Sequence, residues 1–123
     1  MTVVLDSTLL IDHLRGSRVA TEFIAGLGGS PTCSEVTRIE VLQGLRSAEK
    51  RSAAQLFDLL EWVPLDDTVA RRAGELGRRW RRSHPGIDLA DLAIAATAEV
   101  LAVPIVTLNV KHFPMFEGLS APY

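Results

Sequence analysis

Several features are scarce in this sequence, and each scarcity narrows the class of protein. Cys33 is the only cysteine among 123 residues, so no disulfide can form within the chain and a reducing compartment is expected. No apolar run approaches the roughly 20 residues of a membrane-spanning helix, and the N-terminus lacks the basic and apolar stretch of a signal peptide. These absences favour a cytoplasmic protein that does not enter a membrane.

Excess charge is also lacking. The net charge of −2 is too small to make the whole molecule attract a polyanion such as nucleic acid. The length suits one domain spanning residues 1–123, because it allows a hydrophobic core but is short for two. A content of 47% apolar and 23% charged residues is ordinary for a soluble globular domain.

Short apolar stretches alternate with amphipathic ones along the chain. Apolar and β-branched residues predict strands at residues 2–5, 31–33, 62–65 and 104–108. Capping residues and glycines predict helices at residues 8–14 after an N-cap at Ser7, 19–27, 35 to 44 or 46 after an N-cap at Ser34, 50–60, 66 or 67 to about 82, and about 89–101. This alternation predicts an α/β protein whose parallel sheet is covered by helices on both faces. The third strand, which carries Pro64, is expected at or near an edge.

Several acidic residues occupy positions where a buried or active-site carboxylate is expected. Asp6 directly follows the apolar residues 3–5, so it stands at the carboxyl end of a strand, where open α/β sheets place their ligands. Glu40 and Asp91 each interrupt an otherwise mostly uncharged helical stripe. The stripes are Val36, Ile39, Glu40 and Gln43, and Ile87, Ala90, Asp91 and Ile94. Since a charge on a core-facing stripe is costly unless it is paired or binds a metal, these acids indicate a metal site.

Three of the acids have an alternative, purely structural interpretation. Asp6 fits a turn-forming residue after a strand. Asp88, three residues before Asp91, fits either a further carboxylate of the site or the N-cap of the helix that begins at residue 89. Glu40 could instead pair with a nearby arginine; the candidates are Arg38 and Arg46.

The residue types also indicate which metal would bind. Converging carboxylates raise each other's pKa values unless a cation neutralises them. Oxygen ligands suit Mg²⁺ or Mn²⁺, whereas zinc prefers histidine and thiolate, and the chain has no CxxC or HExxH spacing. Because Mg²⁺ is typically held by few carboxylates together with substrate phosphates, the acidic set points to phosphate-ester chemistry.

Four motifs together resemble a known family. They are VVLDST at residues 3–8, SEVTRIEVLQG at 34–44, IDLADLAIAATA at 87–98 and VTLNVKHF at 106–113. In this order and spacing they resemble the PIN-domain ribonucleases, and within them the VapC-type toxins of bacterial toxin–antitoxin pairs. The resemblance implies a three-layer α/β/α sandwich with a short parallel sheet. It also implies an acidic pocket that binds Mg²⁺ or Mn²⁺ and cleaves single-stranded or loop RNA.

The resemblance assigns roles by position. Asp6, Glu40 and Asp91 match the first three acids of the family, which act in metal binding and catalysis. The fourth position, often aspartate, is Asn109, whose carbonyl can ligate a metal but adds no negative charge. Asp88 is a candidate for the missing carboxylate, so the number of metals stays open.

Further residues are expected around this set. Ser7 and Thr107 are expected to hydrogen-bond the ligands or their waters and so orient them. Their alternatives are a helix N-cap for Ser7 and an ordinary strand residue for Thr107. His84 and His112 are interpreted as surface or loop residues, with His112 able to touch an RNA phosphate.

Basic residues gather in one segment of the chain. An aromatic among arginines is typical of surfaces that bind phosphates and stack bases. The candidate RNA-binding residues are Arg78, Arg79, Arg81 and Arg82. The alternative is a solvated helix face with Trp80 packed into the core, and for Trp80 that is the favoured interpretation because large aromatics are mostly buried.

The resemblance also implies partners. A cognate VapB-type antitoxin would place a C-terminal segment, commonly with an arginine, into the acidic pocket. A homodimer and a toxin–antitoxin hetero-oligomer are expected as well.

Other classes of protein also use clustered acids. A phosphotransferase of the haloacid-dehalogenase kind needs a second aspartate two residues after the first, where this chain has Thr8. A response-regulator receiver needs a phosphoacceptor after a central strand, and Asp66 and Asp67 are poor candidates. A PIN-like module that binds RNA or a partner without cutting remains, and Asn109 is the feature in its favour.

Overall fold

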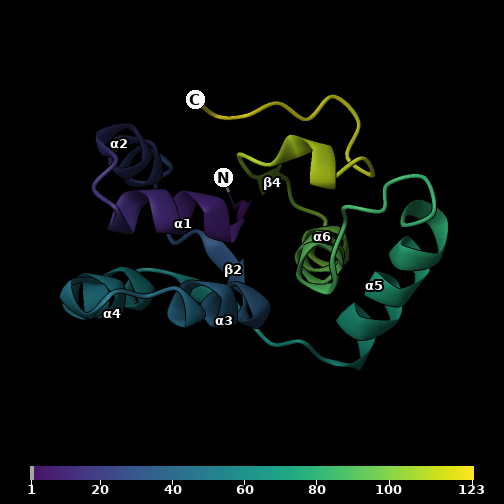
Figure 1. Cartoon of the computed structure of the whole chain (residues 1–123), viewed down its shortest axis with the longest axis horizontal. Helices are drawn as coiled ribbons and strands as arrows, with labels where there is room; N and C mark the ends of the chain where they lie inside the picture. Colours follow the sequence, from purple (N-terminus) through teal and green to yellow (C-terminus); the bar gives the residue numbers. More distant parts are fainter. Residues whose placement is uncertain (1) are drawn as a thin grey trace.

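The computed structural model describes residues 2–123, and in that range it contains a parallel four-stranded sheet flanked by six α-helices (Figure 1). This confirms the predicted α/β/α arrangement. The strands are β1 (Val4–Leu5), β2 (Thr32–Ser34), β3 (Glu61–Val63) and β4 (Ile105–Val106). All are shorter than or shifted by a residue or two from the predicted stretches, since only the residues paired in the ladder count as strand.

The sheet has the order β3-β2-β1-β4, with every neighbouring pair parallel. Val4 pairs with Thr32 on one side and with Ile105 on the other, so β1 lies inside the sheet. β3 lies at an edge, as the neighbouring Pro64 predicted, because proline cannot donate to a further strand.

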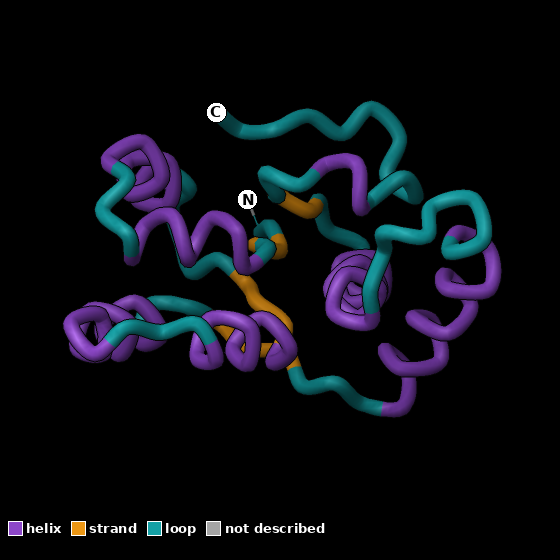
Figure 2. The backbone as a smooth tube through the Cα atoms, in the orientation of Figure 1, coloured by secondary structure: helices purple, strands orange, loops and turns teal. Residues whose placement is uncertain are grey.

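The helices follow their capping signals. They are α1 (Ser7–Leu14), α2 (Arg18–Gly26), α3 (Glu35–Gln43), α4 (Lys50–Asp58), α5 (Asp67–Trp80) and α6 (Leu89–Leu101). The α6 bounds match the prediction, and Ser34 caps α3 as its position suggested by accepting a hydrogen bond from the Val36 amide. Two short 3₁₀ helices at Ser47–Glu49 and Val110–His112 were not anticipated. Figure 2 shows how few residues the sheet uses compared with the helices.

The sheet divides the core into two layers because side chains of β1 alternate between its faces. Val4 packs on one side, in a cluster formed mainly by α5, α6 and Phe113. Val3 and Leu5 pack on the other side, in a cluster with residues of α1, α3 and α4. Within residues 2–123, no helix is both long and apolar enough to cross a membrane. The two layers leave the carboxyl end of β1 between α1, α3 and α6.

Candidate functional site

Asp6 ends β1 and is buried, with only 3% of its surface exposed. One carboxylate oxygen, Oδ1, accepts a hydrogen bond of 2.8 Å from the Ser7 amide, so Asp6 itself is the N-cap of α1. The other, Oδ2, accepts hydrogen bonds from the hydroxyls of Thr8 at 3.1 Å and Thr107 at 2.7 Å. These donors come from α1 and from the segment after β4, and they fix the carboxylate in one orientation.

The suggestion that Ser7 caps α1 is therefore wrong. Ser7 is the first residue of the helix, and its hydroxyl donates a hydrogen bond of 2.9 Å to Oε1 of Glu40 on α3. Neither arginine proposed as a partner for Glu40 pairs with it. Arg38 pairs with Glu35 at 2.7 Å, and the Arg46 amide donates to Glu49. Glu40 is thus held by a neutral donor and keeps its negative charge unpaired within residues 2–123.

Glu40 has a pKa raised above its ordinary value. The main cause is burial, since the residue is only partly exposed to water. The hydrogen bond from Ser7 acts in the opposite direction, and the negative charges of the neighbouring acids raise the pKa further. Those neighbours are Asp6, Asp88 and Asp91. The fold therefore places the other three acids near enough for their charges to act on Glu40, although most of them lie far apart in sequence.

Asp88 and Asp91 begin α6 as a reciprocal cap. The Asp91 amide donates to Oδ1 of Asp88 at 2.9 Å, and the Asp88 amide donates to Oδ2 of Asp91 at 3.1 Å. Asp88 is exposed while Asp91 is 7% exposed. Burial raises the pKa of Asp91 to about 6, and the charge of Asp88 adds to the rise, whereas the Asp88 amide and His112 oppose it. The capping alternative for Asp88 is thus present in the structure, and a role in metal binding stays a prediction.

His112 is a neighbour of the site that the sequence interpretation missed. Its Nδ1 atom lies 3.0 Å from Oδ2 of Asp91 and 2.8 Å from Nδ2 of Asn109. Asn109 in turn donates its backbone amide to the Thr107 hydroxyl at 2.9 Å. The sequence held one sign of this contact: His112 follows Asn109 by three residues, a spacing that places both side chains on one turn. Depending on the tautomer, the Nδ1 atom of His112 donates to Asp91 or accepts from the Asn109 side-chain amide, so Asn109 lies beside His112 rather than on an acid.

The donor chemistry of this site suits a hard divalent cation. The described residues 2–123 contain no group of three His, Cys, Asp or Glu side chains already close enough to enclose an ion. The carboxylates of Glu40 and Asp91 are nevertheless partly desolvated, and the other acids raise their pKa values, a situation that a cation would relieve. Mg²⁺ needs few protein ligands because it keeps several waters. The residue types therefore fit the predicted metal, with the ligand set left as a prediction.

An open groove of about 590 Å³ runs along Glu40 and Asp88, between α3 and the start of α6. It is lined by Val36, Ile39, Glu40, Gln43, Arg81, Asp88, Leu89 and Ala90. The expectation that the α3 stripe faces the core is wrong, since Ile39 is 62% exposed and Gln43 is exposed. The buried residues of α3 are Thr37 and Val41, on the face toward α1 and the sheet. The α3 stripe is instead one wall of the groove.

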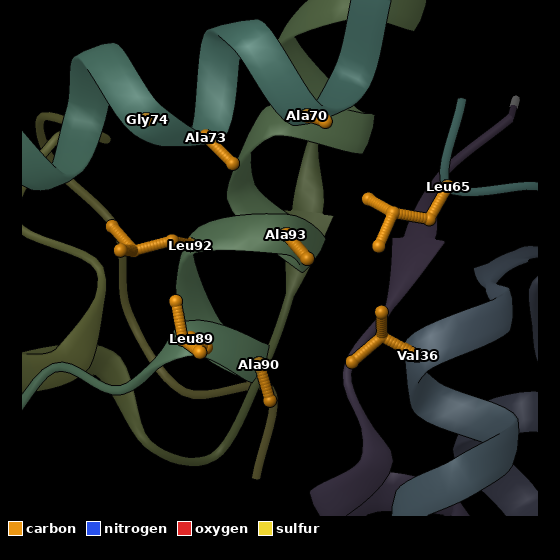
Figure 3. Close-up of a pocket in the computed structure, with 9 residues that line it drawn as sticks. All are labelled: Val36, Leu65, Ala70, Ala73, Gly74, Leu89, Ala90, Leu92 and Ala93. Atoms are coloured by element: carbon orange, nitrogen blue, oxygen red, sulfur yellow. The ribbon is translucent and has the colours of Figure 1, made fainter. Parts of the chain in front are cut away.

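A second, apolar hollow of about 330 Å³ continues from this groove. Figure 3 shows Val36 and Leu65 on one side of it and residues of α5 and α6 on the other. Its lining residues are Val36, Leu65, Ala70, Ala73, Gly74, Leu89, Ala90, Leu92 and Ala93. Because Val36, Leu89 and Ala90 line both hollows, the acidic groove and this apolar slot form one continuous surface.

The arginines of α5 do not form a single basic stripe. Arg71 pairs with Asp67, and Arg72 pairs with Glu75 and Glu99. Arg79 lies over the Trp80 ring, 5.1 Å from its centroid, and lines a separate pocket with Glu75 and Glu99. Trp80 itself packs against the core, as its favoured interpretation held. Arg78, Arg81 and Arg82 are exposed, and binding of RNA by any of these arginines stays a prediction.

The sequence is similar to that of a known protein family over nearly its whole length. The PIN domain family model matches residues 3–114. Ribonuclease VapC19 of Mycobacterium tuberculosis is 42% identical over 98% of this chain and 98% of that protein. Ribonuclease VapC10 of the same species is 43% identical over 98% of this chain and 92% of that protein.

Solved structures show the same similarity in three dimensions. A chain of a toxin–antitoxin complex from Klebsiella pneumoniae has a TM-score of 0.83 at 25% identity, covering 98% of both chains. A chain of DNA-bound VapBC from Salmonella typhimurium has a TM-score of 0.78 at 20% identity, over 98% of this chain and 96% of that one, and supports the fold alone.

Proposed function

We propose that this chain is the ribonuclease toxin of a toxin–antitoxin pair. The chain belongs to the PIN-domain family, and it matches VapC ribonucleases along nearly its whole length. It is an endoribonuclease that hydrolyses phosphodiester bonds of RNA, and a VapB-type antitoxin is its partner. The observation that supports this function is that the charges of Asp6, Asp88 and Asp91 act on Glu40, which lines an open groove with Asp88.

The acids divide into ligands and supporting groups in this proposal. Asp6, Glu40 and Asp91 hold Mg²⁺, with Mn²⁺ able to substitute, and Asp88 is a fourth carboxylate within reach of the same site. When bound, such an ion lowers the pKa of a water and offsets negative charge on the phosphate. Asn109 acts at the fourth family position, beside the His112 imidazole that also lies against Asp91.

Ser7 and Thr107 orient the acids. Each donates a hydroxyl hydrogen bond to one carboxylate, to Glu40 and to Asp6 respectively. Such donors restrict the rotation of a carboxylate and so hold it in one orientation. A bound cation would relieve the repulsion among the acids and would offset their negative charge toward a phosphate.

The surface next to the acids suits the antitoxin. The groove is acidic and open, and the apolar slot continues from it. A peptide with one basic and several apolar side chains would neutralise the carboxylates and cover Ile39, Leu65 and Leu89, which are at least half exposed. A homodimer, a single PIN domain over residues 1–123 and a cytoplasmic location complete the proposal.

A second candidate is a PIN-like module that binds RNA without cutting it. Two observations favour it: the residues described include no preformed three-ligand cluster, and Asn109 contacts His112 rather than an acid. Against it stands the burial of Asp6 and Asp91, because an inert module gains nothing from keeping like charges together.

The deciding experiment is cleavage of a mixed pool of structured cellular RNAs by purified, antitoxin-free protein. Reactions contain Mg²⁺, Mn²⁺ or EDTA, and an Asp6→Ala protein prepared in the same way serves as the control. Metal-dependent cutting at a few sites, lost in Asp6→Ala, is expected. Absence of cutting by folded wild-type protein in every condition would favour the inert module, and Asn109→Asp would then test whether the fourth charge restores activity.

A further inference from the structure

Arg81 is distinguished from the other arginines of its segment by where it lies. It follows the last residue of α5, keeps helical backbone angles, and lines the acidic groove together with Glu40 and Asp88. Among the residues that line this groove in the described chain, it carries the only positive charge. Arg78 and Arg82 do not line the groove, although they are neighbours in sequence.

The position of Arg81 follows from a face of small residues on α5. Ala70, Gly74, Gly77 and Arg81 are spaced by four, three and four, which places them along one side of the helix. A Cβ atom at Gly77 would lie 3.0 Å from Cδ1 of Leu92 on α6, closer than packing allows without a shift. The glycine therefore permits α5 and α6 to approach, and the close approach carries Arg81 to the start of α6.

One end of the Arg81 guanidinium is fixed and the other is free. Its Nε donates a hydrogen bond of 3.1 Å to the carbonyl of Ile87, the residue before Asp88. Within residues 2–123 this is the only hydrogen bond of the side chain, and Arg81 forms no ion pair there, although two acids line the same groove. The terminal nitrogens thus remain available as a planar pair of donors, a shape that matches two oxygens of a phosphate.

A phosphate in this groove needs such a donor. Four carboxylates repel the RNA backbone, and a bound cation would offset that repulsion only at the reacting phosphate. We propose that Arg81 binds the phosphate next to the scissile one and so sets the register of the RNA strand across the acids. This inference rests on the proposed ribonuclease function and adds a substrate-binding residue to it.

A purely structural role for Arg81 predicts different behaviour. If the contact with Ile87 only holds the start of α6, its loss would lower the melting temperature and disturb Asp88 and Asp91. If the guanidinium binds phosphate, its loss would weaken RNA binding although the protein remains folded at the assay temperature. Arg81→Lys separates the two, because lysine keeps the charge but cannot reproduce the fixed fork.

The test uses Arg81→Ala, Arg81→Lys, Arg78→Ala and Arg82→Ala in otherwise unchanged protein. RNA binding is measured by fluorescence anisotropy with Mg²⁺ at several salt concentrations, each change being repeated in an Asp6→Asn background so that the RNA stays intact. The probe is a labelled single-stranded RNA that contains a site cut by the wild type, or, if nothing is cut, a mixed-sequence RNA of the same length. Melting temperature and single-turnover cleavage are measured in parallel.

We expect Arg81→Ala to raise the Kd roughly tenfold or more, as for loss of a charge-assisted hydrogen bond, and to lower the salt slope by about 0.7. Arg81→Lys keeps most of the salt slope and loses affinity by less. Arg78→Ala and Arg82→Ala remove the same charge with a smaller loss of affinity. Equal losses of RNA affinity in all three alanine variants would overturn the proposal. It would also be overturned if both Arg81 variants lost RNA affinity only in proportion to a fall in melting temperature.

The same measurements distinguish a wrong ribonuclease assignment from a wrong role for Arg81. If the wild type cuts no RNA with any metal, the proposed activity is wrong, while the anisotropy series still reports whether Arg81 contacts RNA. If the wild type cuts and Arg81→Ala binds and cuts as Arg78→Ala does, the activity stands and the Arg81 proposal is wrong.

Discussion

Helices α3 and α6 carry the same arrangement of an acid within a largely apolar stripe, yet the fold uses them differently. In α6, every residue from Asp91 to Ala98 is buried, because α5, the sheet and α3 all pack against it. In α3, only Thr37 and Val41 are buried, and Ile39 is 62% exposed. A stripe pattern shows that several side chains share a face, but it does not show whether another element covers that face.

The difference extends to the two acids. Asp91 lies at the base of the site, where burial raises its pKa to about 6, and it contacts an imidazole and a backbone amide. Glu40 lies on the groove wall, half-buried, and is held by one hydroxyl. We infer that the buried helix supplies the rigid part of the site and the exposed one supplies its opening to substrate.

The largest effect is expected from Asp91→Asn. The amide removes a negative charge from the proposed metal site but can still accept the Asp88 hydrogen bond, so cleavage should fall by roughly a thousandfold or more without unfolding. Single-turnover cleavage and circular dichroism measure the two properties. Glu99→Gln on the same helix, which loses only its pairing with Arg72, is the matched control and should cleave normally. A folded Asp91→Asn protein with full activity would contradict the site.

The packing contrast predicts a difference in stability. Ile94 of α6 is fully buried, so Ile94→Ala should lower the free energy of unfolding by about 2–5 kcal/mol. Ile39→Ala on α3 should change it by about 0.5 kcal/mol or less, because the side chain is already in water. Urea denaturation followed by circular dichroism measures both. Similar losses would mean that a further element covers α3 in the isolated protein.

Ser7→Ala tests how Glu40 is held. Loss of the hydroxyl donor leaves Glu40 free to rotate and raises its pKa further, since this hydrogen bond favours the ionised form. Metal affinity or cleavage should fall about tenfold to a hundredfold, as for other residues that orient ligands. Titration of cleavage with Mg²⁺ measures the change. Ser17→Ala, which removes the α2 cap, should cost about 1 kcal/mol of stability but leave the Mg²⁺ titration unaltered.

The smallest effect is a pH-dependent stabilisation by metal. The folded protein holds a proton on Asp91 up to about pH 6, whereas the unfolded chain releases it near 3.8, so metal-free stability should fall as pH rises through this interval. Mg²⁺ binds the ionised carboxylate, and millimolar Mg²⁺ should therefore raise the melting temperature by a few degrees at pH 7.5 and hardly at all at pH 5. Thermal denaturation with Mg²⁺ and with EDTA measures this shift. The same shift in Asp91→Asn would show that the ion binds elsewhere.

Much of the site could be anticipated from local sequence. Asp6 was found because it follows an apolar strand, and Glu40 and Asp91 because a charge interrupts a stripe. His112 was missed, since nothing within one turn of it reveals that Asp91 lies opposite. Arg81 could not be told apart from Arg78, because both are exposed arginines on a basic helix and only the position of α6 decides which one faces the acids.

By itself, the sequence determined the approximate positions of the strands and helices, their alternation along the chain, and the identity of the candidate acids. These depend on neighbours within a few residues, through capping, alternation and helical spacing. Only the tertiary structure decided that Ser7 holds Glu40 and that the α3 stripe opens onto a groove. Each of these outcomes depends on contacts between residues distant in sequence. Such contacts form only when the helices have packed on the sheet.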